Sequence, residues 1–327
     1  MKKIYFRADA SGDIGYGHFI RTLALADMLK NDFECVFVTQ SPTEYQRSEV
    51  SKICRLVEVP ATEEKFGLFL EMLEGDEIVV LDNYFYDTDY QRKIKEKGCK
   101  LVCIDDMHDK HYVADVVVNH AVYEKCLFDV ESYTVLCLGL DWALLRTPFI
   151  ESVEGGGSVT RQKKCIVFAF GGSDMFDLTK RVASVLERFE YSFDAIGIIG
   201  DGIKYRFEDL KYERVRFVKN LLAEEVAELF QCATYAILPA STMCLEAIAC
   251  RSKLLVGYFV DNQAKFAEYL GKHRYAYFLD DMSSESFESN LEIALAEVIN
   301  GGFQYEPNEL ITPGIRKRYI DLFKMLS

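Results

Sequence analysis

The sequence predicts an α/β protein that is built from two parallel-sheet domains of similar size. Short apolar runs alternate with helical patterns in both halves of the chain, as in parallel strands that are joined by crossover helices. The alternation stops once, at a polar, glycine-rich stretch over residues 151–162, which we interpret as a linker. A chain of 327 residues, half of them apolar, is also long enough for two hydrophobic cores.

The first domain is expected over residues 1–150. Its apolar runs predict strands at Lys3–Arg7, Glu34–Thr39, Arg55–Val59, Glu77–Leu81, Lys100–Ile104 and Asp115–Val118. Helices are expected between these strands, among them Thr22–Met28, Phe66–Leu73 and Tyr90–Lys97.

The second domain is expected over residues 163–327. Its predicted strands are Lys164–Phe170, Phe193–Ile199, Arg214–Val218, Tyr235–Pro239, Lys253–Tyr258 and Tyr275–Leu279. Its predicted helices are Leu178–Phe189, Ala223–Gln231, Thr242–Ala249, Gln263–Lys272 and Ser284–Ile299. A last amphipathic helix, Ile315–Leu326, is a candidate to return to the first domain.

Charge and composition narrow the classes of partner. The formal net charge is -14, from 52 acidic and 38 basic residues, which argues against general binding to nucleic acid or to an anionic membrane. Signal-peptide features and long apolar runs are lacking, and the ten cysteines are scattered without a CxxC pair. We therefore expect a cytoplasmic monomer with buried, reduced thiols.

The stretch Arg7–Arg21 is the first candidate site. Here a glycine-rich turn joins the first strand to the first helix, and His18 lies where that helix begins. Such a turn lies at the carboxyl ends of the strands, where ligands bind in open parallel sheets. His18 can accept a proton near neutral pH, although an incidental histidine in an ordinary turn is the alternative. Other candidates for substrate contact here are Gly17, Arg21 and Asp9, which either polarises His18 or caps the turn.

Glycines also follow the first strand of the second domain. Gly171, Gly172 and Ser173 come directly after that strand, and glycines let backbone N–H groups approach a phosphate closely. The alternative is that Ser173 or Asp174 caps the next helix. The GK[ST] residues of a nucleotide-triphosphate loop do not follow.

Polar residues mark two further strand ends in the second domain. Ser241 and Thr242 precede a helix and can bind phosphate, and Glu246 one turn later can accept ribose hydroxyls, unless these residues form only a helix cap. Asn262 and Gln263 carry amides that suit sugar hydroxyl and acetamido groups, unless Asn262 is only a helix N-cap.

In the first domain, Tyr84 follows a strand, where it either donates to a leaving phosphate or lines the sugar pocket, unless it only starts an ordinary loop. The adjacent Asp105 and Asp106 suggest a metal site or a retaining acid/base pair, but neighbouring side chains on an extended chain point in opposite directions. We therefore predict no metal site.

Together these motifs resemble the UDP-sugar hydrolases of pseudaminic acid biosynthesis. Members of that family convert UDP-2,4-diacetamido-2,4,6-trideoxy-β-L-altropyranose to the free sugar and UDP. The resemblance spans roughly residues 3–270 and follows the family's order through Arg7–Ser11, Ile14–His18 with Arg21, Asp82–Tyr84, Ile104–Asp106, Leu140–Arg146, Gly171–Asp174, Ala240–Ser241 with Glu246, and Asn262–Gln263.

The resemblance implies a GT-B fold, in which two Rossmann-like domains face a central cleft, and a reaction without metal or cofactor. It implies that His18 is the catalytic base, that Tyr84 and Asn262 lie in the substrate site, and that Glu246 binds the ribose. The reaction implied is hydrolysis with inversion at C1, in the supply of a sugar for surface glycans.

Three other functions are compatible with the same motifs. A glycosyltransferase of this fold moves the sugar to an acceptor, and the first domain shows no clear acceptor surface. A non-catalytic sensor of nucleotide-sugars would not need His18. An epimerase acting at C2 would keep the bond between sugar and nucleotide.

Overall fold

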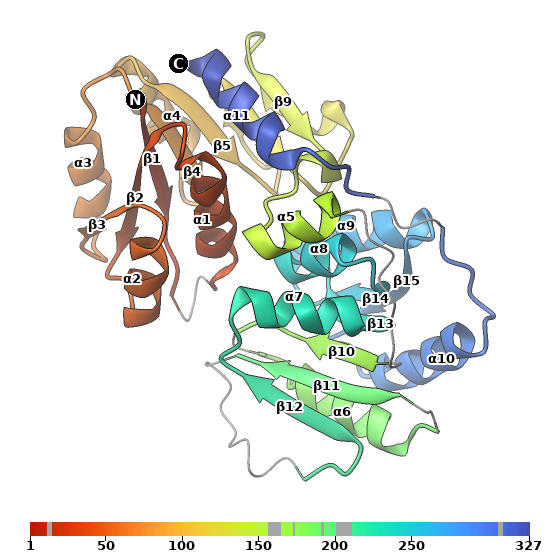
Figure 1. Ribbon diagram of the computed structural model, residues 1–327. Coiled ribbons are helices and arrows are strands. Elements are labelled where there is room, and N and C mark those ends of the chain that lie inside the picture. The colour runs from red at the N-terminus through yellow and green to blue at the C-terminus, as the bar shows by residue number, and fades with distance from the viewer. Residues whose placement is uncertain (12–14, 156–164, 173, 191–192, 201–210, 307–309) are drawn as a thin grey trace. The chain divides into compact units, whose positions relative to one another are not determined.

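The computed structural model describes residues 1–327 except 12–14, 156–164, 173, 191–192, 201–210 and 307–309 (Figure 1). The chain divides into two compact units. Unit 1 consists of Met1–Thr147 and Gly314–Ser327, and unit 2 consists of Pro148–Pro313. The first and last segments of the chain therefore belong to the same unit.

Unit 1 is built on a parallel sheet in the order β3-β2-β1-β4-β5-β7-β9. Its strands are β1 (Lys3–Ala8), β2 (Glu34–Gln40), β3 (Arg55–Val59), β4 (Ile78–Asp82), β5 (Lys100–Ile104), β7 (Val116–Asn119) and β9 (Val135–Leu138). The side chains of β4 and β7 are buried on both faces, as expected for parallel strands that are covered on both sides. Among the strands of this sheet, the short β9 was not predicted from the sequence pattern.

The helices of unit 1 are α1 (Gly17–Leu29), α2 (Glu44–Ser51), α3 (Glu64–Glu71), α4 (Thr88–Glu96) and α11 (Ile315–Leu326), with 3-10 turns η1 (Lys125–Leu127) and η2 (Leu140–Trp142). Helix α1 begins earlier than predicted, so His18 lies within its first turn. The ring of Phe19 packs on that of Phe37 in β2 with a centroid distance of 5.3 Å. This contact fixes the start of α1 against the sheet.

The strand order of unit 1 reverses between β1 and β4. From β1 the chain proceeds to β2 and β3 on one side, and later to β4, β5, β7 and β9 on the other. In open α/β sheets, such a switch point opens a crevice at the carboxyl ends of the two strands, and ligands bind there. The turn before His18 and the end of β4 at Asp82 both lie at this point.

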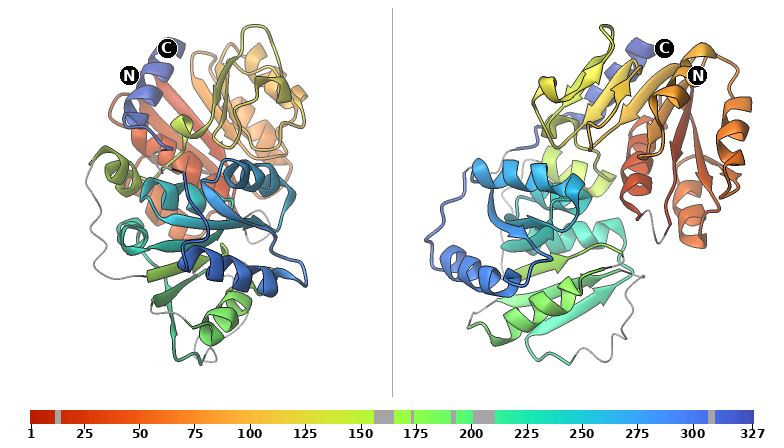
Figure 2. Two further views of the ribbon diagram at one scale, coloured as in Figure 1. Left: turned by 90° about the vertical axis from the view of Figure 1, so that its right-hand side faces the viewer. Right: turned by 180° about the vertical axis from the view of Figure 1, so that it is seen from behind.

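Helix α11 completes unit 1 from the far end of the chain (Figure 2). The hydroxyl of Tyr319 donates to the carbonyl of Trp142 at 2.7 Å, and the ring of Phe323 packs against Phe33. Arg318 donates to the carbonyl of Asp141 at 3.0 Å. The amphipathic pattern of the tail is therefore satisfied within unit 1.

Unit 2 contains a second parallel sheet in the order β12-β11-β10-β13-β14-β15. Its strands are β10 (Cys165–Ala169), β11 (Asp194–Ile199), β12 (Val215–Lys219), β13 (Tyr235–Pro239), β14 (Lys253–Tyr258) and β15 (Ala276–Asp281). The strand order reverses between β10 and β13. The two strand ends that were predicted to bind phosphate therefore meet at a switch point of their own.

The helices of unit 2 are α5 (Thr147–Glu154), α6 (Leu178–Arg188), α7 (Ala223–Cys232), α8 (Thr242–Ala249), α9 (Asp261–Lys272) and α10 (Phe287–Ile299). Helix α5 corrects the predicted linker over 151–162, because residues 151–154 are helical. Phe149, Ile150 and Val153 give this segment a buried apolar face, and the glycine run that begins at Gly155 ends it. Residues 156–162 lie outside the described part of the chain.

All ten cysteines are free thiols in the structure. Burial raises the pKa of Cys35, Cys54 and Cys137 to about 12 in each case, so these thiols are poor nucleophiles. Cys126 and Cys232 are exposed, contrary to the expectation of general burial. Within the described residues, no helix has the length and apolar character that crossing a bilayer requires.

A small pH effect is expected from the short pair β6 (His111–Tyr112) and β8 (Asp129–Val130). Hydrogen bonds from His111 to Asp129 at 2.9 Å and to Glu131 at 3.2 Å raise the pKa of His111. Its contribution to stability is therefore present below the unfolded-state pKa and is lost as the pH rises through the raised value. Since exposed pairs contribute at most about 1 kcal/mol, His111→Gln should lower unfolding free energy slightly at pH 5.5 and not at pH 9. Urea titrations of both proteins measure this, and an equal loss at both pH values would contradict it.

Candidate active site

The turn after β1 brings His18 to the carboxyl edge of the sheet. Gly15 has a φ of +80°, a left-handed conformation that glycine adopts without strain. Its N–H donates to the carbonyl of Ser11 at 2.9 Å, which closes the turn. Helix α1 then begins at the exposed Gly17, and its N-cap residue Tyr16 makes no side-chain capping bond. The prediction that Gly17 contacts substrate is compatible with this exposed position.

Asp82 at the end of β4 holds the His18 imidazole. Its carboxylate is fully buried and lies 2.7 Å from His18 Nδ1. It also accepts hydrogen bonds from Arg21 Nε and a terminal nitrogen at 2.6 Å each, and from Thr22 Oγ1 at 2.8 Å. Burial opposes ionisation, but Arg21 and His18 outweigh it, so the pKa of Asp82 lies well below its usual range.

This carboxylate decides the tautomer of His18. Because Asp82 is ionised, it can only accept, and Nδ1 of His18 must carry the proton of their hydrogen bond. A terminal nitrogen of Arg21 also approaches Nδ1, at 3.1 Å, but it already donates to Asp82 at 2.6 Å. The other ring nitrogen, Nε2, then keeps its lone pair. The arrangement suits proton abstraction by Nε2, with Asp82 stabilising the imidazolium that forms.

Arg21 joins this pair to a second carboxylate. A terminal nitrogen of Arg21 donates to Asp106 at 2.9 Å, and the hydroxyl of Tyr84 donates to the same oxygen of Asp106 at 3.2 Å. The Tyr84 ring lies edge-on to His18 with a centroid distance of 4.7 Å. Burial and the Asp106 carboxylate raise the pKa of Tyr84, so its phenol remains a donor at neutral pH.

Asp105 and Asp106 serve separate networks, as expected for neighbours on an extended chain. Asp105 accepts from the Tyr112 hydroxyl at 2.5 Å and pairs with His108 at 3.1 Å. Burial is outweighed by these bonds, which lower the pKa of Asp105 to about 2. Since Asp106 instead contacts Arg21 and Tyr84, the two carboxylates do not converge on one ligand position.

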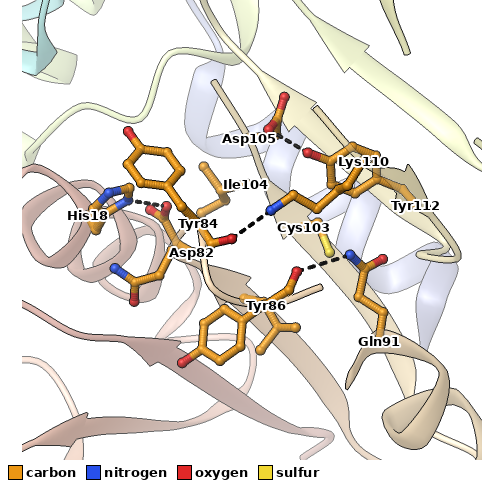
Figure 3. A pocket seen from close by; sticks show the side chains of 12 residues that line it. His18, Asp82, Tyr84, Tyr86, Gln91, Cys103, Ile104, Asp105, Lys110 and Tyr112 are labelled. Atoms are coloured by element: carbon orange, nitrogen blue, oxygen red, sulfur yellow. Dashed lines mark hydrogen bonds and ion pairs between the residues drawn. The ribbon is translucent and has the colours of Figure 1, made fainter. Parts of the chain in front are cut away.

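A small pocket adjoins the histidine. Its lining includes His18, Asp82, Asn83, Tyr84 and Asp105 (Figure 3), and its volume of about 10 Å³ has room for about one water molecule. The pocket therefore has room for about one water molecule beside His18 and Asp82.

Two residues that were predicted to contact substrate are almost completely buried. Asp9, which was expected to polarise His18 or contact substrate, is fully buried, and its carboxylate is bound by Arg7 and by Lys65 at 3.1 Å. Asp82 orients His18 instead. Arg21, also expected to contact substrate, is only 5% exposed because its guanidinium bridges two carboxylates. Both residues position other groups.

In unit 2, Gly171 and Gly172 end β10 as predicted. Gly171 has a φ of +78°. The loop lies close to Gly200, because a Cβ atom added to Gly200 would be only 2.5 Å from the Cα of Gly172. Asp174 caps α6, because its carboxylate accepts from the N–H groups of Leu178 at 2.7 Å and of Thr179 at 3.0 Å. Ser173, the third predicted contact of this loop, lies outside the described residues. The first N–H groups of α6 are thus bound by a carboxylate of this chain, and phosphate contact by the glycine loop stays a prediction.

The start of α8 differs from that of α6. Ser241 is its N-cap residue but forms no side-chain capping bond, so Ser241, Thr242 and the first N–H groups of the helix can bind an anion. Strand β13 pairs with β10, which places Ser241 and Gly171 at neighbouring strand ends. Glu246 lies in the next turn and is 1% exposed.

Asn262 and Gln263 lie in the first turn of α9, after β14. The N-cap residue of α9 is Val260, so the alternative that Asn262 is an N-cap is wrong. Gln263 accepts from the N–H of Phe259 at 3.2 Å and is buried. Its amide oxygen therefore closes the turn before α9, and sugar contact by Gln263 stays a prediction. Asn262 is the half-buried amide at this strand end.

Comparisons with known proteins extend these observations. No protein-family model matches the chain. It is 27% identical over 288 residues to the UDP-2,4-diacetamido-2,4,6-trideoxy-beta-L-altropyranose hydrolase of Campylobacter jejuni, a match that covers 84% of this chain and 97% of that protein. The resemblance that the sequence motifs predicted is thereby confirmed.

Solved structures give the fold. MurG of Acinetobacter baumannii is similar with a TM-score of 0.65 at 12% identity, over 99% of this chain and all (100%) of that one. The UDP complex of MnaA from S. aureus has the same TM-score of 0.65 at 12% identity, over 100% of this chain and 98% of that one. The protein has a GT-B fold. The two parallel sheets described above are the Rossmann-like halves of this GT-B architecture, as predicted.

The structure brings some of the predicted site residues together and adds two carboxylates to them. Two predicted site residues, His18 and Tyr84, lie together in unit 1. The positioning roles of Asp82 and Asp106 were not predicted, although an acidic residue at the end of an otherwise apolar strand is a recognisable signal. In the described residues, carboxylates grouped closely enough for a metal occur at Glu74, Asp76 and Glu77, before β4 begins and not at the His18 end of the strand.

Proposed function

We propose that the protein hydrolyses a UDP-linked 2,4-diacetamido-2,4,6-trideoxy sugar to the free sugar and UDP, with inversion at C1, in pseudaminic acid biosynthesis. The observation that carries the proposal is the hydrogen bond between His18 and the buried Asp82 carboxylate, beside a pocket of one-water size. The similarity to a protein named as such a hydrolase supports the substrate class.

A single base is sufficient for this chemistry. Ordinary glycosidases need a second carboxyl group because an alkoxide leaves poorly without a proton. UDP is a stable anion at neutral pH, so its departure needs charge stabilisation and no general acid. His18 Nε2 removes a proton from water, the water oxygen attacks C1, and the bond from C1 to the β-phosphate oxygen breaks. Attack opposite to the leaving group inverts C1.

Unit 2 is proposed to hold UDP. Gly171, Gly172 and the first turn of α8 at Ser241 and Thr242 offer N–H and hydroxyl donors at neighbouring strand ends, where they stabilise the negative charge that develops on the β-phosphate. Asn262 is proposed to contact the sugar. These donors make the reaction independent of a metal in our proposal.

The test is to incubate the protein with UDP-2,4-diacetamido-2,4,6-trideoxy-β-L-altropyranose and no acceptor, and to follow the anomeric proton by NMR. We expect UDP and free sugar, with the inverted anomer appearing before mutarotation. Release only after an acceptor is added would indicate a glycosyltransferase, and an epimer still linked to UDP would indicate an epimerase. Binding without any product would leave a sensor.

The ribose role of Glu246 gives a further prediction. Because a hydrogen bond to a charged group is worth about 1.5–3 kcal/mol, Glu246→Ala should raise the KM roughly tenfold or more and change kcat little. The exposed Glu228 on α7 of the same unit provides the matched control, Glu228→Ala. Steady-state kinetics measure both variants, with thermal melts to verify folding. An unchanged KM in a folded Glu246→Ala protein would remove the ribose assignment.

A further inference from the structure

A buried ionic cluster lies beside the candidate site, and the proposed reaction makes no direct use of it. We call Arg7, Asp9, Gln40 and Lys65 the β1 cluster. Arg7 and Asp9 are fully buried and paired with each other. Lys65, from α3, donates to Asp9 at 3.1 Å and to Gln40 Oε1 at 2.7 Å, and the N–H of Gln40 donates to Asp9 at 2.8 Å.

The β1 cluster contacts the loop after β4 at three points. Asn83 and Asp9 exchange two hydrogen bonds, from the N–H of Asp9 to Asn83 Oδ1 at 2.7 Å and from Asn83 Nδ2 to the carbonyl of Asp9 at 3.2 Å. The ammonium of Lys65 lies 4.3 Å from the ring centre of Phe85. The guanidinium of Arg7 lies 5.8 Å from the ring centre of Tyr86.

This loop carries the groups that face His18. Asp82, which binds Nδ1, directly precedes it, and Tyr84, whose ring lies edge-on to the imidazole, is its second residue. The bonds between Asp9 and Asn83 also tie the loop after β4 to the loop after β1, and the latter leads to His18. A change in these bonds is therefore expected to move Tyr84, and through Asp82 and Tyr84 to alter the surroundings of His18.

Stability alone is a weak explanation for such a cluster. Burying ions costs several kcal/mol each, and buried pairs are often no more stabilising than apolar residues of similar volume. A satisfied polar network does, however, specify one arrangement of the backbone around it. The β1 cluster satisfies Asp9 and Asn83 from several directions, which favours a role in setting geometry.

We propose that Asn83 is a positioning residue for catalysis, which holds the loop after β4, with Tyr84, in a fixed position relative to the loop after β1. Lys65 supports Asn83 through its contacts with Asp9 and Phe85. This inference rests on the proposed hydrolase function. Since misplacement of a reacting group by about 1 Å can lower a rate about 100-fold, loosening this arrangement should act on kcat. It should leave the KM unchanged within twofold, because UDP is held by unit 2 in our proposal.

The kinetic test compares Asn83→Ala and Lys65→Met with a matched control. Gln46→Ala removes another fully buried side-chain amide of unit 1. Gln46 lies on α2, and its Oε1 accepts from the N–H of the N-cap residue Thr43 at 2.8 Å. We expect kcat to fall about 10- to 100-fold in both test variants, with the KM kept, and to stay at the wild-type value in Gln46→Ala. The two test variants remove different contacts, so one remains informative if the other does not fold.

An NMR measurement makes the test independent of turnover. The Tyr84 ring shifts the His18 Cε1 proton through its ring current, and with five histidines in the chain that signal is assigned by its loss in His18→Asn. We expect it to move in Asn83→Ala and Lys65→Met and to stay in place in Gln46→Ala. The inference is overturned if both folded test variants keep the wild-type kcat, or if the chemical shift of the His18 Cε1 proton is unchanged in both. If the wild type releases no UDP, the proposed function fails, and the His18 signal alone still decides whether the loops are coupled.

Discussion

His18→Asn should lose turnover by about 10²- to 10⁴-fold, which is the usual contribution of a positioned general base. Asparagine keeps a polar side chain at the start of α1 but has no group that accepts a proton near neutral pH. Asp82 retains its bonds to Arg21 and Thr22, so the rest of the network remains in place. The loss should therefore appear in kcat while UDP still binds.

Two measurements check this expectation. Release of UDP gives kcat, and calorimetric titration with UDP gives the Kd, which should stay within twofold of the wild type. His273→Asn is the matched control, because His273 is exposed at the end of α9 in unit 2. Wild-type turnover in a folded His18→Asn protein would refute the assignment of the base.

Asp82→Asn should affect both catalysis and stability. If the side-chain carbonyl of the introduced asparagine accepts from Arg21, its amide nitrogen faces His18 Nδ1 and donates to it. The proton of the imidazole then moves to Nε2, and the base is lost. We expect kcat to fall by about 10²- to 10⁴-fold. Arg21 also loses a buried partner at 2.6 Å, and removal of one partner from a buried ion pair costs roughly 3–5 kcal/mol.

The stability loss has a defined pH dependence. The pKa of Asp82 is lowered in the folded protein, so its carboxylate stabilises unit 1 above the unfolded-state value of about 3.9 and this contribution is lost as the pH falls further. Urea unfolding of wild type and Asp82→Asn should therefore differ at pH 7 and converge in acid. Asp115→Asn is the control, since Asp115 pairs with Lys95 at 2.5 Å, outside the site, and should cost stability without changing kcat. Full turnover in Asp82→Asn would contradict the tautomer argument.

Much of the fold could be predicted because parallel strands are buried on both faces and produce apolar runs. Strands β4 and β14 lie within one residue of their expected bounds. Helix α2 was missed because its sequence, EYQRSEVS, has little apolar character. Its signal was the capping box between Thr43 and Gln46. The tail helix could be predicted as a helix, but its partner could not, because packing against Trp142 depends on tertiary structure.

The candidate base could be chosen from the sequence because histidine is the side chain that ordinarily accepts a proton near neutral pH. His18 stood out because it follows a glycine turn at a strand end. The partner of His18 could not be chosen from sequence, because Asp9 and Asp82 both lie at the ends of neighbouring strands. The two carboxylates differ in the cationic side chains that bind them. Arg7 and Lys65 bind Asp9, while Arg21 on α1 binds Asp82.

The return of α11 to unit 1 bears on how the chain folds during synthesis. Unit 2 is one uninterrupted segment, whereas unit 1 joins residues 1–147 to residues 314–327. Domains generally fold as units as they emerge from the ribosome. Unit 1 can therefore complete its packing only after unit 2 has been translated, and until then the groups that contact α11, among them Phe33 and the carbonyl of Trp142, lack that partner.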